Sequence, residues 1–148
     1  MASELRTLQE AFQQALNTHD VAKMGALLAE DVMYWEANLP QPLEGRKAVQ
    51  DHYRENWKAF PDASLRFTAT VEGGDRIAGE GTWSATNKGP ITMPGQPPIP
   101  ATGKRAEGRF ASVARVEKGK VKELNIYYDN MQFLAQLGLI PPPGSRPR

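Results

Sequence analysis

The apolar residues of this chain change their spacing near residue 60, and this change limits the folds that the chain can adopt. Up to that point they recur every three or four residues, as on one face of an α-helix. From residue 65 onward they alternate with polar residues, as in strands that have one buried and one wet face. A helical part followed by a run of strands is typical of the α+β class, with helices gathered on one side of an antiparallel sheet.

Three helices are predicted before the change in spacing. Ser3 and Asp20 are suitable N-caps for the first two, and Gly45 opens the third. A strand, Val32–Glu36, lies between the second and third helices, and the two prolines of Asn38–Pro42 make the next segment a loop. The apolar residues at helical spacing are Leu5, Leu8, Phe12, Ala15 and Leu16, then Val21, Met24, Leu27 and Leu28, and then Val49, Tyr53, Trp57 and Phe60.

Four strands are predicted after the change in spacing. The first is expected to turn Leu65, Phe67, Ala69 and Val71 inward, and a hairpin turn at Gly73–Asp75 joins it to the second. In the second strand, two glycines on the face of a tryptophan predict a sharp bend or free space. The four strands are the segments 65–72, 77–85, 109–116 and 124–128.

The segment between the second and third of these strands, residues 87–103, is rich in Pro and Gly but carries apolar side chains, which is typical of a lid or rim. After the last strand, Asp129 is predicted to cap a final helix that ends near Leu137. A bent sheet wrapped over a few helices leaves a cone-shaped hollow. We therefore predict a cone-shaped α+β barrel, with three N-terminal helices packed in a curved antiparallel sheet, plus a C-terminal helix. One domain (1–140) is followed by a flexible Pro-rich tail (141–148).

Composition excludes several classes of function. The 148 residues carry a net charge of +1 with both signs mixed, so no basic surface for nucleic acid is expected. There is no cysteine, which excludes thiolate chemistry and disulfides and fits a reducing compartment. No apolar run is long enough to span a membrane, and the N-terminus lacks an apolar signal core, so a cytoplasmic protein is expected. Two histidines and the lack of metal- or phosphate-binding motifs predict no metal and no cofactor.

The strand Val32–Glu36 carries the candidate catalytic residues. Its alternation places Val32, Tyr34 and Glu36 on one face. If that face lines a pocket, Glu36 is a lone carboxyl whose charged form is disfavoured by desolvation, which suits a base. Alternatively, the strand ends here and Glu36 is solvated at the rim. Tyr34 either donates to a ligand oxygen or is a core tyrosine bonded to a backbone carbonyl.

The remaining candidates are pocket walls and a cap. His52 is expected to face solvent, and Asp129 to act as a helix cap and not in catalysis. Each wall residue alone could simply fill the core, but the set predicts a small apolar cavity with Ser112 as a weak polar contact. The candidate ligand-binding residues are Phe12, Tyr53, Trp57, Trp83, Phe110, Ser112, Ile126 and Tyr128.

Short segments along most of the chain carry a resemblance to a known superfamily. They are Ala15–Asp20, Leu27–Val32, Leu43–Arg46, Thr102–Lys104, Gly119–Val121, Tyr127–Asp129 and Leu134–Gly138. In this order they resemble the nuclear-transport-factor-2-like superfamily, in particular its SnoaL-like polyketide cyclase branch. The resemblance implies the fold more strongly than the function, because the superfamily includes isomerases, cyclases, dehydratases, epoxide hydrolases and non-catalytic binders.

The resemblance transfers few catalytic residues. The aspartate and histidine of the cyclases would fall on Ile126 and Ser112, so both are missing. The Asp-Arg-Asp set of limonene epoxide hydrolase would fall on Trp83, Gly81 and Ile126 and is also absent, whereas its water-holding tyrosine and asparagine would fall on Tyr34 and Glu36. The base of ketosteroid isomerase would fall on Glu36, and its oxyanion donors on Phe12 and Ser112, where they are lost.

Three hypotheses follow. The chain could be a cofactor-independent isomerase, cyclase or dehydratase acting on a small apolar carbonyl compound, with Glu36 as base and Tyr34 polarising an oxygen. It could instead bind such a molecule without chemistry, which the missing aspartate at Ile126 favours. Third, it could be an interaction protein whose working surface is the outer sheet face. That face is fairly apolar, so a homodimer through it is expected under any of the three hypotheses. The face consists of Ala111, Val113, Asn125 and Tyr127.

Overall fold

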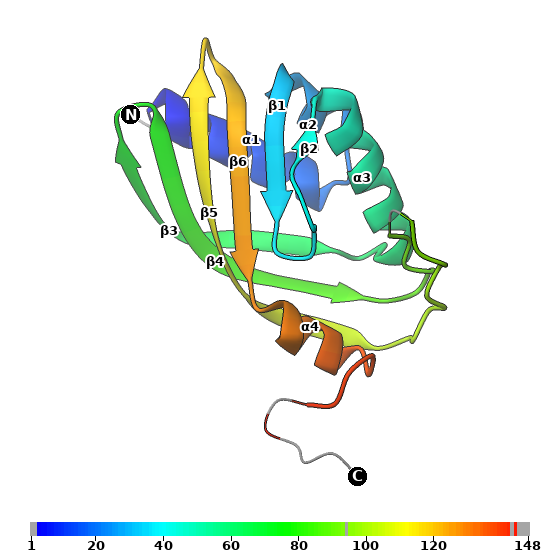
Figure 1. The fold of residues 1–148 in the computed structure, drawn as a ribbon. Coiled ribbons are helices and arrows are strands. Elements are labelled where there is room, and N and C mark those ends of the chain that lie inside the picture. The colour runs from blue at the N-terminus through cyan, green and yellow to red at the C-terminus, as the bar shows by residue number, and fades with distance from the viewer. Residues whose placement is uncertain (1–2, 94, 143, 145–148) are drawn as a thin grey trace.

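The described part of the protein forms four helices and six strands. In a computed structural model, which describes residues 3–93, 95–142 and 144, they are α1 (Glu4–Asn17), α2 (Val21–Ala26), β1 (Leu28–Glu36), β2 (Leu43–Glu44), α3 (Arg46–Ala59), β3 (Ser64–Gly73), β4 (Arg76–Thr86), β5 (Arg105–Glu117), β6 (Lys120–Tyr128) and α4 (Asn130–Gln136). Figure 1 shows a curved, unclosed sheet, with α4 at one end of it. The strand order is β2-β1-β6-β5-β4-β3. The predicted α+β class is confirmed.

The sequence predicted an antiparallel sheet, but one pair of neighbouring strands, β1 and β6, is parallel. Tyr34 is paired with Leu124 and Glu36 with Ile126. Helix α3 and the strands β2, β3, β4 and β5 lie between β1 and β6 in the chain, and β6 then runs beside β1 in the same direction (Figure 1). The carboxyl ends of these two strands, more than 80 residues apart in the chain, therefore meet at one edge of the sheet.

Several predicted boundaries need correction. β1 begins at Leu28 and not at Val32, and β5 begins at Arg105 and not at Arg109. The short β2 lies where no strand was expected, and it pairs with β1 through Met33 and Tyr34. Both added starts contain a buried residue, Leu28 in β1 and Ala106 in β5, so the strands extend further into the core than the alternation predicted. Element ends are the least reliable part of a prediction from sequence.

The predicted inward row of β3 is wrong beyond Phe67. The register of β3 against β4 shifts between Phe67 and Ala69, and such a bulge exchanges the two faces of the strand. Thr70 consequently turns inward and donates to Gln9 of α1 at 2.8 Å, while Val71 is 68% exposed. The polar side chain that α1 offers at this point compensates the inward threonine.

The two glycines of β4 serve the fold and not a ligand. A Cβ atom on Gly81 would lie 1.9 Å from the carbonyl oxygen of Arg66 on β3, and one on Gly79 would lie 2.6 Å from the ring of Phe67. Both glycines therefore let β3 and its phenylalanine approach β4 closely, so the free space that was one of the two predicted readings is not found there.

Side-chain caps begin three of the helices as predicted. Ser3, Asp20 and Asp129 each accept a hydrogen bond from the backbone amide three residues later. Gly45 precedes α3 with φ of +96°, a conformation that a residue with a Cβ atom rarely adopts. The guanidinium of Arg46 then donates twice to the carbonyl oxygen of Leu28, at 2.8 and 3.1 Å, and fixes α3 against β1.

The core has two parts. The larger part lies between the helices and the sheet, where Met24, Leu28, Val32 and Val49 are completely buried. The smaller part, which includes Leu137, lies under α4. The predicted tail 141–148 lies largely outside the described residues, and the division of the chain at residue 140 stays a prediction. None of the helices in the described ranges is long and apolar enough to cross a membrane.

Candidate active site

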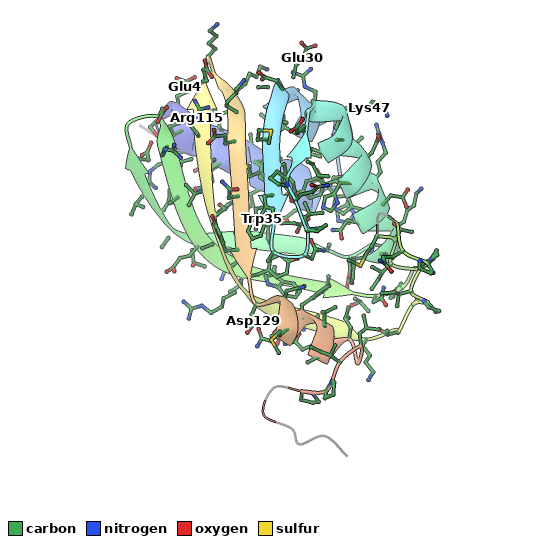
Figure 2. The ribbon with its side chains drawn as sticks, viewed as in Figure 1. Glu4, Glu30, Trp35, Lys47, Arg115 and Asp129 are labelled. Atoms are coloured by element: carbon green, nitrogen blue, oxygen red, sulfur yellow. The ribbon has the colours of Figure 1, made fainter. Side chains whose placement is uncertain are left out.

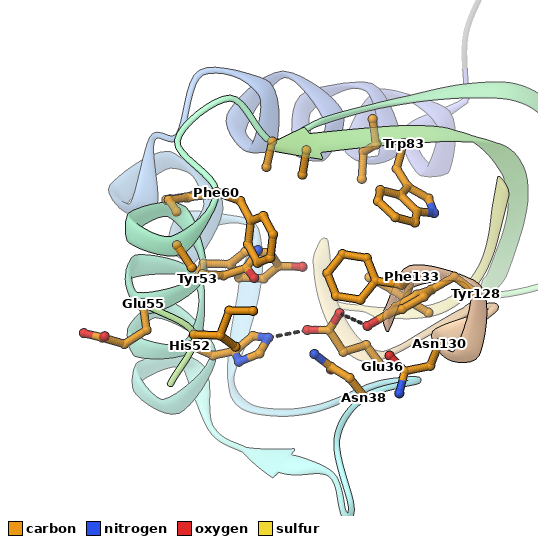
Figure 3. A pocket seen from close by; sticks show the side chains of 18 of the residues that line it. Glu36, Asn38, His52, Tyr53, Glu55, Phe60, Trp83, Tyr128, Asn130 and Phe133 are labelled. Atoms are coloured by element: carbon orange, nitrogen blue, oxygen red, sulfur yellow. Dashed lines mark hydrogen bonds and ion pairs between the residues drawn. The ribbon is translucent and has the colours of Figure 1, made fainter. Parts of the chain in front are cut away.

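A cavity of about 450 Å³ lies between α3, the sheet and α4. Its walls are mostly apolar, with many aromatic side chains, and Ile91, Met93 and Ile99 of the long loop 87–103 complete them, as expected for a rim. Phe133 of α4 packs edge-on against Trp83 at 5.3 Å between ring centres and closes one end (Figure 3). The aromatic lining residues are Tyr34, Tyr53, Trp57, Phe60, Trp83, Phe110, Tyr128 and Phe133.

Glu36 is enclosed in the wall of this cavity. It is the last residue of β1, and its side chain is only 16% exposed. One carboxylate oxygen contacts Nε2 of His52, and the other accepts a hydrogen bond from the Tyr128 hydroxyl at 3.4 Å (Figure 3). Of the two arrangements predicted for Glu36, the coordinates place it in the enclosed one.

The carboxyl of Glu36 is, however, not alone. His52 was predicted to face solvent, but it lies against this carboxyl. The side chain of His52 is 19% exposed, and its ring packs against those of Tyr34 and Tyr53 at 5.7 and 5.5 Å. His52 follows Val49 by three residues and therefore lies on the same side of α3 as the buried stripe. This spacing is a signal in the sequence that could have identified His52, because a helix packed into a concave sheet is covered on its flanks too.

Tyr34 is a buried residue with an unexpected partner. It is 1% exposed, and its hydroxyl bonds to that of Tyr53 at 2.6 Å instead of to a backbone carbonyl. Burial, followed by the nearby charge of Glu36, raises the pKa of Tyr34 well above its ordinary value, and the same two causes raise the pKa of Tyr53 and of Tyr128. Three neutral hydroxyls thus surround one carboxyl. Because Tyr34 and Tyr53 share one hydrogen bond, one of their two protons is left for a ligand oxygen.

Two of the predicted wall residues do not reach the cavity. Phe12 and Ser112 are 7% and 6% exposed but lie deeper in the core. On α1, Leu16 lines the cavity instead, one turn after Phe12. On β5, Ser112 lies two residues beyond Phe110 in the direction away from α4, which packs near the start of this strand. The other six line the cavity: Tyr53, Trp57, Trp83, Phe110, Ile126 and Tyr128.

Sequence reasoning also missed Asn38 and Asn130, whose side chains line the cavity beside Glu36 (Figure 3). Nothing in the residues around them distinguishes them from ordinary loop and helix-start asparagines. Within the described ranges, no group of three or more His, Asp or Glu side chains could hold a metal ion. The arrangement of one carboxyl, one imidazole and three phenols in an apolar cavity is suited to proton transfer.

Comparisons with known proteins agree with this architecture. The model of the SnoaL-like polyketide cyclase family matches residues 6–137, which confirms the predicted resemblance. No curated protein matches the chain.

Solved structures show the same fold. A protein assigned as a polyketide cyclase from Xanthomonas campestris has 24% identity and a TM-score of 0.78, covering 90% of this chain and 96% of its own. A SnoaL-like protein from Jannaschia has 14% identity and a TM-score of 0.79, covering 93% of both chains. A protein with a ketosteroid isomerase-like fold from Catenulispora acidiphila, in complex with trimethylamine, has 19% identity and a TM-score of 0.74, covering 90% of this chain and 93% of its own.

Proposed function

Because this chain belongs to the SnoaL-like polyketide cyclase family, we propose that it binds a small, largely apolar carbonyl compound and moves a proton on it without a cofactor. The family supports a cyclase- or isomerase-type protein that binds small molecules. The finer assignment rests on one observation: the only carboxyl that is held by a histidine and a tyrosine in the described part of the cavity wall is that of Glu36.

In the proposed reaction Glu36 is the base. Its carboxylate takes a proton from the carbon next to the carbonyl group, and the electron pair of that C–H bond moves onto the carbonyl oxygen to give an enolate. The proton that Tyr34 and Tyr53 leave over donates a hydrogen bond to this oxygen, and such donors stabilise developing charge strongly in a water-poor site. Where the substrate has a C=C bond between its β- and γ-carbons, the enolate is conjugated with that bond, so return of the proton to the γ-carbon moves the double bond and completes an isomerisation. His52 is a positioning residue that holds the carboxyl of Glu36.

The position of Glu36 supports this assignment. In the resemblance, the aspartate and the histidine of the cyclases fall on Ile126 and Ser112. In the sheet, Ile126 is paired with Glu36 on one side and with Ser112 on the other. The carboxyl therefore projects from the strand next to the position that the cyclases use, into the same cavity. A base in this place would keep the family's chemistry with a different residue.

The test is proton exchange on a simple ketone. We expect the protein to accelerate deuterium exchange at the carbon between the ring and the carbonyl of 2-tetralone in D₂O, measured by NMR against a protein-free sample. Glu36→Gln should abolish the acceleration. Glu44→Gln is the matched control, because Glu44 is exposed on β2 and outside the cavity. Full acceleration by Glu36→Gln would refute the role of Glu36.

A purely binding function is the second candidate, and Ile126 favours it. This residue is 8% exposed and puts an apolar wall where the cyclase aspartate would stand. The same experiment separates the two candidates, because a binder would bind 2-tetralone by calorimetry and leave its exchange rate unchanged.

We also propose a cytoplasmic homodimer that uses the outer sheet face, defined by Ala111, Val113, Asn125 and Tyr127. On this face Tyr127 is 49% exposed and packs against Trp35 of β1, with ring centres 5.4 Å apart. Figure 2 labels Trp35 on β1. Light scattering coupled to size-exclusion chromatography should give the mass of a dimer, and Tyr127→Glu should shift it towards a monomer. A wild-type protein that elutes only as a monomer would exclude this interface.

A further inference from the structure

Two asparagines lie just past the ends of the two parallel strands. Asn38 follows Glu36, the last residue of β1, by two residues, and Asn130 follows Tyr128, the last residue of β6, by two residues. Because β1 and β6 are parallel, both asparagines emerge at the same edge of the sheet. The Tyr128 hydroxyl donates to Glu36 at 3.4 Å, so the ends of the two strands are in contact. Figure 3 shows both carboxamides beside Glu36.

Each of these carboxamides has a buried oxygen without a partner. Oδ1 of Asn38 and Oδ1 of Asn130 are shielded from solvent and accept no hydrogen bond from the described residues. Such atoms are rare in folded proteins, because a buried polar group without a partner is costly. A third such atom, Nε1 of Trp83, lies over Gly108 and is turned away from Glu36 (Figure 3).

Asn87 shows how the fold treats an asparagine that has a structural role. Its side chain is completely buried outside the cavity, and its amide group donates to the carbonyl oxygens of Ala59 and Gly89 at 3.3 and 2.8 Å. Its Oδ1 accepts from the backbone amide of Thr102 at 2.7 Å. The fold thus provides hydrogen-bond partners for both the amide group and the oxygen of the Asn87 side chain. It provides none for the buried oxygens of Asn38 and Asn130, which points to a partner that comes from outside the chain.

We propose that Asn38 and Asn130 bind a hydroxyl group of the ligand next to Glu36, so that the protein selects ring compounds that carry a hydroxyl near the reacting carbonyl. The selection of compounds with a hydroxyl near the reacting carbonyl rests on the proposed function, whereas the binding of a hydroxyl group does not. A ketone oxygen only accepts hydrogen bonds, and so do the oxygens of the two asparagines and of Glu36. A hydroxyl group both donates and accepts, and a carboxamide can turn to meet it either way.

The rest of the cavity fits the body of such a compound. Trp57, Phe60, Trp83 and Phe133 present flat apolar surfaces, and the volume of about 450 Å³ is enough for a few fused rings. His52, Tyr128 and the two asparagines lie beside Glu36, so a ring compound would place its oxygen-bearing edge towards this group.

The test compares 2-naphthol with 2-methoxynaphthalene by isothermal titration calorimetry. The two probes share the ring system, but the methoxy group cannot donate a hydrogen bond. We expect wild type to bind 2-naphthol about tenfold more tightly, as one or two neutral hydrogen bonds in an apolar site would give. The double variant Asn38→Ala/Asn130→Ala should bind both probes with similar affinity. No preference in wild type, an unchanged preference in the double variant, or binding of neither probe would overturn the proposal.

Two controls make the result specific. Asn87→Ala should melt at a lower temperature because it breaks satisfied hydrogen bonds, yet it should keep the preference for 2-naphthol. If the double variant unfolds, the leucine variants Asn38→Leu and Asn130→Leu, measured singly, replace it.

Glu36→Gln should retain the preference. If Glu36→Gln keeps full proton exchange as well, the proposed function fails while the hydroxyl site stands; if Glu36→Gln alone removes the preference, the hydroxyl site fails.

Discussion

The hydroxyl pair of Tyr34 and Tyr53 gives a measurable test of how the cavity is built. Tyr34→Phe removes one hydroxyl and leaves the hydroxyl of Tyr53, a residue that is 6% exposed, without its partner. Tyr53→Phe leaves the hydroxyl of Tyr34, a residue that is 1% exposed, without its partner. Each single change should lower the free energy of unfolding by about 1–3 kcal/mol, the cost of an unpaired buried hydroxyl. The ring contact at 5.6 Å is kept in both variants.

The double variant distinguishes an unpaired group from a merely lost bond. Tyr34→Phe/Tyr53→Phe removes both hydroxyls, so no polar group is left unpaired, and we expect a loss of about 1 kcal/mol or less. The sum of the two single costs should therefore exceed the cost of the double variant by at least about 1 kcal/mol in a double-mutant cycle. Urea unfolding followed by circular dichroism measures all four proteins, and Tyr127→Phe on the outer face is the control. Additive costs, or single costs no larger than that of the control, would refute the buried pair.

Two further predictions concern pH and the last helix. The pKa values of Tyr34, Tyr53 and Tyr128 are raised on folding, so as pH rises above about 10 these tyrosines lose their protons in the unfolded chain before they do so in the folded one. The free energy of unfolding should therefore fall in this range, by about 1.4 kcal/mol per pH unit for each tyrosine. Urea unfolding between neutral and alkaline pH checks this; a stability that stays constant through that range contradicts it. Asp129→Ala should lower stability by about 1 kcal/mol through loss of the cap, whereas Asp129→Ser should keep most of it in thermal melts.

Local patterns predicted much of this protein because each of them depends on a few neighbouring residues. The N-caps Ser3, Asp20 and Asp129 and the inward placement of Tyr34 and Glu36 are of this kind. A spacing of two or of three to four residues is imposed by the backbone itself, so it is visible wherever one side of an element is buried.

Contacts between distant segments were not predictable in the same way. The bulge that turns Thr70 inward depends on Gln9, 61 residues earlier, which can bond to it. The enclosure of His52 depends on the end of β1, 16 residues earlier, where Glu36 offers a carboxyl. In each case a polar side chain occupies an inward position that the apolar pattern would assign to another residue, and its partner is what makes that position acceptable.

The candidate site has its origin in one such long-range contact, the parallel pairing of β1 with β6. Had the two strands been antiparallel neighbours, the end of one would lie beside the start of the other, and Glu36 could not share a hydrogen bond with Tyr128. Parallel pairing also makes both chains leave the sheet at one edge, which brings Asn38 and Asn130 to the same carboxyl. Glu36, Tyr128 and the two asparagines that we assign to ligand recognition are therefore brought together by a single pairing, so moving either asparagine one residue along its segment should weaken the preference for 2-naphthol while leaving Glu36 in place.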